Sequence, residues 1–330
     1  MLAARLHGAR DLRLGVEPDP IAGPGESLVR VDAVGICGSD LHWFLEGAIG
    51  ENRLTQPVVP GHEMGGTIVS GPRAGLRVAI EPAIPCGRCR YCLAGWVNLC
   101  PTCSFAGQGT VDGGFRQLMA WPDGLLSVVP DVIADDQVPL IEPLLIALHA
   151  DSLRPVRRGD QVAVVGCGPI GLLQVQVARL GEPARILAVE PLAHRRAAAL
   201  HAGATEAMGA VAPGEGEPAF DVVYDASGSP GAVAAAVDLA RPGGTVVLAG
   251  IPDDDATTFQ ASVARRKGLS LLLVRRSVPA NERAYRLIEA GRVRLDGLVS
   301  HRYALSGATQ AFEAAASRQG LKVIVQPGQA

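Results

Sequence analysis

The sequence predicts an α/β protein of two domains, a β-rich domain followed by a domain built on a doubly wound parallel sheet. The length of 330 residues suits two domains, because a domain usually has roughly 100–200 residues. Short segments with strand character fill residues 1–35, and residues 28–34 alternate partly in polarity after a Gly/Pro turn. Further along, a glycine-rich loop joins an apolar strand to a helix, which is the arrangement of a parallel-sheet domain.

Composition and charge exclude several classes of protein. Hydrophobic residues make up 48% of the chain and charged residues 19%, as in a soluble globular protein with a large core. The net charge is −3 and the paired arginines are scattered, so we expect no nucleic-acid partner. No apolar run approaches the ~18–20 residues of a membrane span, and the N-terminal segment lacks the apolar core of a signal peptide. We therefore expect a cytoplasmic protein without membrane contact.

The cysteines favour metal binding over disulfides, because they are odd in number and clustered in a chain expected to stay in the cytoplasm. Four of the seven follow the spacing Cys86-x2-Cys89-x2-Cys92-x7-Cys100. Four thiolates at this spacing close a tetrahedral site and predict a structural zinc. The loop has little apolar packing of its own, so the metal would order it. Four buried thiols or a redox cluster is the alternative, and Cys103, outside the spacing, could take the place of Cys100.

A second set of metal-binding side chains lies in the β-rich domain. Cys37, Ser39 and His42 occur within six residues of one another, just after a strand. His62 and Glu63 follow in a stretch flanked by glycines. Cys, His and Glu hold zinc in an open catalytic site, with one position left for water or substrate. These two stretches therefore predict a catalytic zinc site.

The first of these stretches also allows a simpler interpretation. Ser39 or Asp40 could be the N-cap of a helix that starts here, and His42 could be an ordinary surface or core residue. Between the cysteines and His62, residues 67–78 predict a short surface hairpin without consequence for chemistry.

The second domain begins with a nucleotide-binding motif. Residues 160–165 form an apolar strand that leads into Gly166, Gly168, Pro169, Ile170 and Gly171 and then into an apolar helix. This is G-x-G-x-x-G in the strand–turn–helix context that it requires, with a pyrophosphate expected at the helix N-terminus. Cys167 occupies one of the variable positions of the motif.

An acidic residue after the next strand favours NAD over NADP. The strand at 185–189 ends in Glu190, which lies 19 residues after Gly171. A carboxylate at this distance binds the ribose hydroxyls and repels a 2′-phosphate. Arg195 and Arg196 leave the alternative open, since a nearby arginine can receive that phosphate.

Three more strands complete the expected sheet, at 220–225, 245–251 and 270–276. The carboxyl ends of such strands form the ligand site of a doubly wound sheet, so we expect Ser227, Gly250 and Ile251 to contact the cofactor. A helix at 280–290 and strands at 298–303 and 322–325 then return the chain to the first domain.

At these residues the sequence resembles the zinc-dependent medium-chain alcohol dehydrogenases, most closely the polyol branch with its sorbitol, xylitol, L-idonate and butanediol dehydrogenases. The resemblance covers nearly the whole chain. It implies a GroES-like zinc catalytic domain at 1–149, a Rossmann NAD-binding domain at 150–276 and a return segment at 277–330 that completes the first domain.

The resemblance also implies roles for the residues of the zinc pattern. Cys37 and His62 would be zinc ligands, and Glu63 would bind the metal directly or lie just behind it. Glu142, in the stretch Ile-Glu-Pro-Leu, stands where classical alcohol dehydrogenases carry a cysteine ligand. It would bind zinc directly or through the metal-bound water.

Further residues would serve proton transfer and substrate. The hydroxyl of Ser39 would take the alcohol proton and His42 would pass it towards solvent. Phe105 falls where the polyol branch places an apolar side chain against the substrate, with simple packing as the alternative. Arg276 has a counterpart that helps to position substrate, with a salt bridge as the alternative. Arg195 would lie near the adenine.

The expected function is transfer of a hydride from a secondary alcohol, a polyol or sugar acid, to NAD, which yields a ketone. The expected cofactors are two zinc ions per chain, one catalytic and one structural, and NAD. A simple-alcohol or butanediol dehydrogenase is the alternative enzyme, and a nucleotide-binding sensor or structural protein is the alternative outside catalysis. Family tendency implies a homo-oligomer, a dimer or tetramer.

Overall fold

The computed structural model describes residues 1–211, 214–215, 218–252 and 255–328. By its internal contacts the chain divides into two compact units. The first consists of Met1–Glu142, Asn281–Ile288 and Leu295–Ala330, and the second of Pro143–Ala280 and Glu289–Arg294. The domain boundaries expected near residues 150 and 277 stay a prediction.

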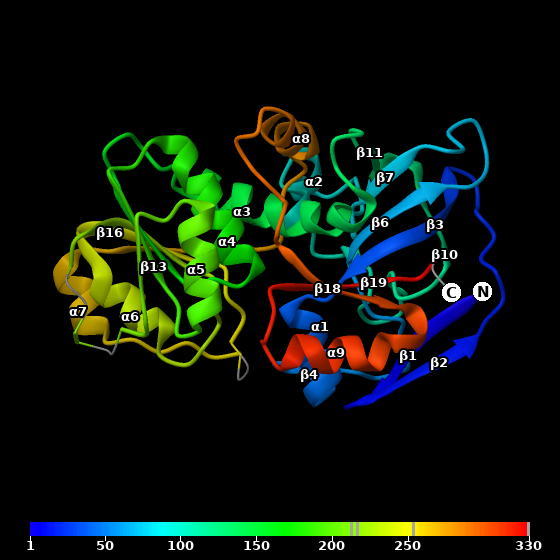
Figure 1. Ribbon diagram of the computed structural model, residues 1–330, viewed down its shortest axis with the longest axis horizontal. Coiled ribbons are helices and arrows are strands. Elements are labelled where there is room, and N and C mark those ends of the chain that lie inside the picture. Colours follow the sequence, from blue (N-terminus) through cyan, green and yellow to red (C-terminus); the bar gives the residue numbers. More distant parts are fainter. Residues whose placement is uncertain (212–213, 216–217, 253–254, 329–330) are drawn as a thin grey trace. The chain divides into compact units, whose positions relative to one another are not determined.

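The first unit is built on a mixed sheet with the strand order β11-β7-β6-β3-β19-β18, and β10 also pairs with β3 (Figure 1). The strands of this sheet are β3 (Glu26–Gly35), β6 (Glu63–Ile68), β7 (Arg77–Ile80), β10 (Leu118–Pro122), β11 (Leu126–Val128), β18 (Val299–Ala304) and β19 (Lys322–Gln326). A hairpin of β1 (Leu2–Gly8) and β2 (Asp11–Val16) and two short pairs, β4 (Ala48–Ile49) with β5 (Asn52–Arg53) and β8 (Ala83–Ile84) with β9 (Ser104–Phe105), lie outside it.

The helices of the first unit are α1 (Gly38–Glu46), α2 (Arg90–Leu93), α8 (Asn281–Glu289) and α9 (Ala308–Ala316), with short 3₁₀ turns η1 (Val97–Leu99), η2 (Asp123–Leu125), η3 (Asp135–Leu140) and η5 (Leu305–Gly307). Of these, α9 packs on β18 and β19 and beside α1, and together they enclose an apolar core. Phe44 of α1 and Phe115 both pack on Phe312 of α9, with ring centroids 5.0 and 5.1 Å away. This core fixes the start of α1 relative to the sheet.

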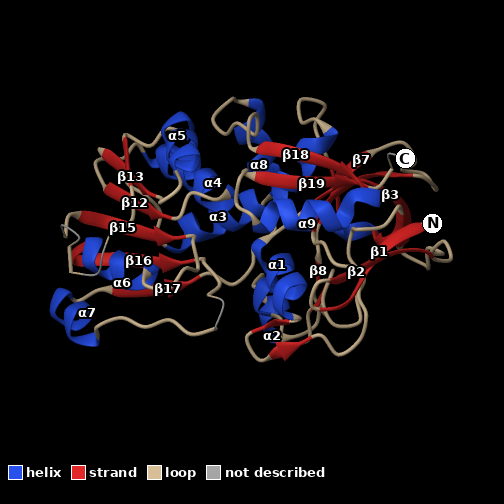
Figure 2. Cartoon of the chain, turned by 60° about the horizontal axis from the view of Figure 1, so that its bottom comes forward, coloured by secondary structure: helices blue, strands red, loops and turns tan. Residues whose placement is uncertain are grey.

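The second unit is a parallel sheet of the order β14-β13-β12-β15-β16-β17 with helices on both faces (Figure 2). Its strands are β12 (Gln161–Val165), β13 (Arg185–Val189), β14 (Glu206–Met208), β15 (Phe220–Asp225), β16 (Ala240–Leu248) and β17 (Ser270–Leu273). Its helices are α3 (Ile141–Leu153), which begins in the first unit, α4 (Pro169–Ala178), α5 (Ala193–Ala202), α6 (Ala232–Leu239) and α7 (Ala261–Lys267), with the 3₁₀ turn η4 (Arg179–Gly181). The strand order reverses between β12 and β15, and a doubly wound sheet binds its ligand at such a point.

The expected fold class is therefore confirmed, with two local corrections. The last strand of the parallel sheet ends at Leu273, so Arg276 lies beyond it and not within it. The N-cap of α1 is Cys37, so neither Ser39 nor Asp40 occupies the N-cap position. Within the described residues, no helix is both long and apolar enough to cross a membrane.

Candidate active site

The first turn of α1 brings the two zinc-binding stretches together. The carboxylate of Asp40 accepts a hydrogen bond from the backbone N–H of Cys37 at 2.9 Å and from that of Gly61 at 3.2 Å. The same carboxylate lies 3.5 Å from Nδ1 of His62. Asp40 is 1% exposed. A buried carboxylate behind a histidine ligand fixes the orientation of the ring, so Asp40 is a site residue that the sequence analysis missed.

Cys37, His62 and Glu63 place three donor atoms within 4.8 Å of one another. One sulfur, one imidazole nitrogen and one carboxylate oxygen are a donor set that suits an open zinc site, so these residues fit the expected metal. Burial acts to lower the pKa of the His62 ring, but Asp40 and Cys37 outweigh it and the net shift is upward.

Glu63 is held by a lysine that the sequence analysis did not connect with the site. The ammonium group of Lys322, at the start of β19, donates to both carboxylate oxygens of Glu63 at 2.7 and 2.5 Å and to the carbonyl of Ile36 at 3.1 Å. Both side chains are almost fully buried. Burial acts to lower the pKa of Lys322, but the Glu63 carboxylate raises it and the net shift is upward. The ion pair links Ile36, the residue before Cys37, to Glu63, the residue after His62.

Glu142 does not belong to this cluster of donor atoms within the described residues. It lies in the first turn of α3, directly after η3, and η3 contacts β6, the strand that begins at Glu63. Burial of the carboxyl group raises the pKa of Glu142 to about 8, while His62 opposes the shift and Glu63 adds to it. Glu142 thus shares the electrostatic surroundings of the site without joining its three clustered donors.

Three more residues of the first unit were expected at the site: Ser39, His42 and Phe105. Ser39 is 8% exposed, and His42 follows one helical turn later with partial exposure. Residues three apart on a helix share one face, so both side chains belong to the same side of α1. The ring of Phe105 packs on His62, with centroids 5.3 Å apart.

The four predicted cysteines form a second, separate cluster. The sulfur atoms of Cys86, Cys89, Cys92 and Cys100 come within 4.8 Å of one another. Cys92 lies 3.9 Å from Cys86 and 3.5 Å from Cys89, close to the sulfur separation of about 3.8 Å that four Zn–S bonds of about 2.3 Å impose in a tetrahedron. Backbone N–H groups of Arg88 and Cys89 lower the pKa of Cys86 to about 6, which favours the thiolate. The residues fit a structural zinc, and Cys103 is outside the cluster.

The glycine-rich loop of the second unit leads from β12 into α4 as predicted. Gly168 is the N-cap of α4 and Pro169 follows in its first turn. A Cβ atom on Gly171 would lie 1.9 Å from the carbonyl oxygen of Gly166, so the tight turn requires glycine there. The loop lies close against the start of α4. The N–H groups in the first turn of this helix fit the pyrophosphate of a dinucleotide.

Glu190 follows β13 and reaches back to this loop. Its carboxylate accepts hydrogen bonds from the N–H groups of Cys167 at 2.8 Å and Leu192 at 3.0 Å. The guanidinium of Arg196 donates to the carbonyls of Glu190 and Pro191 at 2.8 and 2.7 Å. Arg195 lies beside the loop, since a Cβ on Gly168 would be 3.6 Å from its guanidinium. One end of the parallel sheet therefore brings together three groups that were expected to bind the cofactor: the glycine-rich loop, Glu190 and Arg195.

The remaining expected residues follow the neighbouring strands. Ser227 comes just after β15 and donates from its N–H and hydroxyl to Asp225, at 3.0 and 2.8 Å. Gly250 and Ile251 come just after β16, and Ile251 is 48% exposed. Arg276 has a left-handed backbone with φ 52°. Asp225, buried and not foreseen, shapes the loop that holds Ser227.

Comparisons with known proteins agree along the whole chain. Residues 23–131 match the family model of the alcohol dehydrogenase GroES-like domain, and residues 169–290 match that of the zinc-binding dehydrogenases. The sorbitol dehydrogenase of Bacillus subtilis (strain 168) is 31% identical over 99% of this chain and 97% of its own length.

Two solved structures show the same similarity in three dimensions. The L-idonate 5-dehydrogenase of Escherichia coli superposes with a TM-score of 0.90 at 26% identity and covers 98% of this chain and 97% of its own. A zinc-binding dehydrogenase structure from Sinorhizobium meliloti 1021, bound to NADP, superposes with a TM-score of 0.89 at 31% identity and covers 99% of both chains.

Proposed function

Because this chain belongs to the zinc-dependent medium-chain dehydrogenase family, we propose that it oxidises a secondary hydroxyl group of a polyol or sugar acid to a ketone. The observation that carries the proposal is the cluster of Cys37, His62 and Glu63, in a chain similar to a sorbitol dehydrogenase and an L-idonate dehydrogenase. When bound, zinc supplies a Lewis acid for the substrate hydroxyl and the nicotinamide cofactor accepts the hydride.

The chain's own residues supply binding and proton transfer. Cys37 and His62 hold the metal, with Glu63 and Glu142 as carboxylates beside it. Ser39 accepts the proton of the alcohol and His42 carries it outward; their shared face on α1, with the buried residue first and the more exposed one second, supports this order. Phe105, which packs on His62, and Arg276 contact the substrate.

A substrate panel tests the proposal. A substrate with neighbouring hydroxyls, such as sorbitol, is expected to have a kcat/KM at least about tenfold above that of ethanol, which corresponds to about 1.4 kcal/mol. Glu142 is partly buried, and leaving a buried polar group unpaired costs about 1–3 kcal/mol. A second hydroxyl can pair with it and ethanol cannot. The matched pair butane-2,3-diol and butan-2-ol isolates this effect, since they differ by one hydroxyl. If ethanol is the best substrate, the polyol assignment fails and family membership is unaffected.

We propose NAD as the preferred cofactor. The carboxylate of Glu190, bonded to the glycine-rich loop, supports this because it would repel a 2′-phosphate. The contacts of Arg196 with two backbone carbonyls give that arginine another partner. NAD is expected to be preferred by at least about tenfold in kcat/KM, which corresponds to about 1.4 kcal/mol. Glu190→Ala should narrow the ratio, with Glu182→Ala, an exposed acid in the same unit, as the control. Equal kinetics with both cofactors in the wild type would contradict the proposal.

A further inference from the structure

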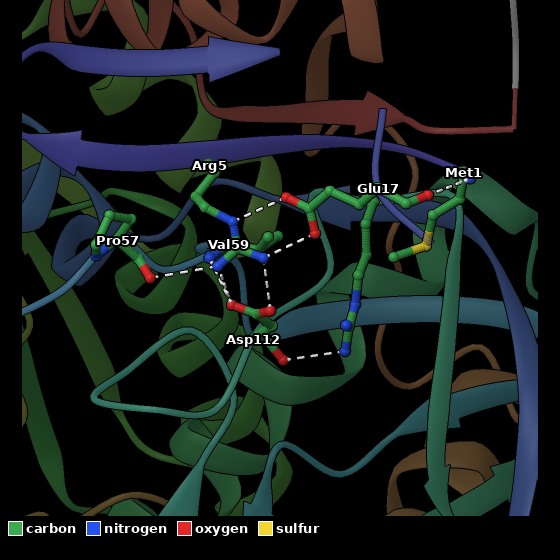
Figure 3. A network of polar contacts seen from close by, with 7 residues as sticks. Met1, Arg5, Glu17, Pro57, Val59 and Asp112 are labelled. Atoms are coloured by element: carbon green, nitrogen blue, oxygen red, sulfur yellow. Dashed lines mark hydrogen bonds and ion pairs between the residues drawn. The ribbon is translucent and has the colours of Figure 1, made fainter. Parts of the chain in front are cut away.

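A partly buried charge network lies beside the segment that leads to His62 (Figure 3). Arg5, on β1, forms two hydrogen bonds to each of two carboxylates. Its guanidinium donates to both oxygens of Glu17 at 2.8 Å and to the two oxygens of Asp112 at 2.9 and 2.8 Å. It also donates to the carbonyl of Pro57 at 3.2 Å. A planar guanidinium can hold two carboxylates in this way, and a lysine cannot.

Asp112 connects Arg5 to the main chain that precedes His62. Its Oδ1 atom accepts a hydrogen bond from the N–H of Val59 at 2.9 Å, three residues ahead of His62. The carbonyl of Val59 in turn accepts from the N–H of Gly113 at 2.6 Å. Asp112 and Gly113 therefore bind both backbone groups of Val59.

The contact between the two segments is close enough to require glycine. A Cβ atom on Gly113 would lie 2.0 Å from the carbonyl oxygen of Gly61. The N–H of Gly114 donates to that same oxygen at 2.9 Å. Two consecutive glycines leave this part of the backbone with much conformational freedom, so its position depends on the anchored residue that precedes it, Asp112.

We propose that Arg5 is a positioning residue for the catalytic metal centre, which holds Asp112 against Val59 and thereby fixes the path of the backbone into His62. The proposal rests on the proposed catalytic zinc site. Metal sites need their ligands held to within about 0.5 Å. Asp40 fixes the His62 ring from one side, and the Arg5–Asp112 pair fixes the backbone that carries the ring.

The release of zinc to a chromophoric chelator tests this role in the intact, metal-loaded protein. Arg5→Met is expected to release one of its two zinc ions at least about tenfold faster than the wild type. This factor is at the lower end of the effect of residues that lie behind metal ligands. The release rate of the other ion should change by less than about twofold. A Cys37→Ser variant identifies the phase that belongs to the catalytic site. The four-cysteine cluster serves as an internal control, because general destabilisation would accelerate both phases.

Arg13→Met is the matched control on the same hairpin. Arg13 makes a similar paired contact with Asp11, but its side chain is 63% exposed, against 23% for Arg5. Among the described residues, its hydrogen bonds go to Asp11 and not to the segment that leads to His62. Release from this variant should match the wild type. Arg5→Lys keeps the charge and should recover only part of the effect, because it cannot hold Glu17 and Asp112 together.

Each outcome decides the proposal. Unchanged release of both ions from folded Arg5→Met, or equal acceleration of both, would overturn it. If Arg5→Met yields no folded protein, Asp112→Asn takes its place, since it keeps the side-chain shape but loses the pairing with Arg5; unchanged release from that variant would also overturn the proposal. A fully loaded wild type with a single zinc ion that Cys37→Ser retains would overturn the proposed catalytic site together with this inference.

Discussion

Replacing Lys322 by methionine is expected to destabilise the protein by about 3–5 kcal/mol, the usual cost of leaving a buried charge without its partner. Methionine keeps the apolar body of the side chain but removes the ammonium group that contacts Glu63 and the carbonyl of Ile36. Glu63 is 1% exposed, so water cannot take over these contacts. The loss should appear in thermal unfolding as a fall in Tm of at least about 6 °C.

Two variants test the reason for this loss. Lys267 is the only other lysine of the chain; it donates to the carbonyls of Val237, Asp238 and Ala240 near the end of α6. Lys267→Met should cost less than about 2 kcal/mol, since it leaves no buried charge. The double variant Lys322→Met/Glu63→Gln should recover at least half of the loss of the single one. A double variant no more stable than Lys322→Met contradicts the explanation by unpaired charge.

The same substitution distinguishes the two roles left open for Glu63. If Glu63 binds zinc directly, the metal neutralises its carboxylate, and Lys322→Met should cost less in zinc-loaded protein than after treatment with a chelator. If Glu63 lies behind the metal, the two losses should be equal. Unfolding of wild type and variant with and without the chelator provides the comparison.

Replacing Cys86 by serine is expected to remove one of two zinc ions and to lower the stability of the first unit by about 3 kcal/mol or more. The free energy of zinc binding to such small sites, about 10–16 kcal/mol, is largely folding free energy. The three remaining sulfurs cannot close the tetrahedron. Elemental analysis gives the zinc content, and calorimetry gives the fall in Tm. The kcat of the folded fraction should change little, because the four-cysteine cluster contains none of the proposed catalytic groups.

Cys103→Ser is the matched control for that experiment. Its sulfur donates to the carbonyl of Ser104 at 3.2 Å and is not one of the four clustered donors. This variant should keep two zinc ions and the Tm of the wild type. Loss of an ion from Cys103→Ser would make Cys103 a ligand in place of Cys100. Loss of turnover in Cys86→Ser with an unchanged Tm would contradict a structural role for the cluster.

The parts of the site that were predictable are those encoded within a few residues. The spacing of Cys86, Cys89, Cys92 and Cys100 predicted a group of four sulfurs, and the structure brings them together. The turn from Gly166 to Gly171 was equally predictable. In both cases a short loop can close only in a few ways, so residue spacing nearly determines the geometry. The grouping of Cys37 with His62 was predicted from their residue types and from the resemblance to a family, because 25 residues separate the two and spacing alone does not bring them together.

Predictions made from neighbouring residues in the sequence were wrong where contacts with distant parts of the chain determine the structure. The strand at the edge of the parallel sheet ends at Leu273, although apolar residues and arginines continue the pattern to Arg276. Cys37 occupies the N-cap position of α1 in place of Ser39 or Asp40. Asp40 points from the first helical turn to the N–H groups of Cys37 and Gly61. The sequence shows that Asp40 lies three residues after Cys37. It does not show that Asp40 also binds the N–H of Gly61.

The sequence by itself determined the four-cysteine pattern, the nucleotide motif and the α/β class, because each depends on residues close together in the chain or on the period of apolar residues. The tertiary structure decided which charges support the site. Gly61 meets Asp40 across 21 residues, Asp112 meets Arg5 across 107, and Lys322 meets Glu63 across 259. A lysine is almost never fully buried without a partner, but many carboxylates of the sequence could have served. Only the pairing of β19 and β6 on either side of β3 selects Glu63, because strand register, which the sequence does not specify over such separations, brings the two side chains to the same place.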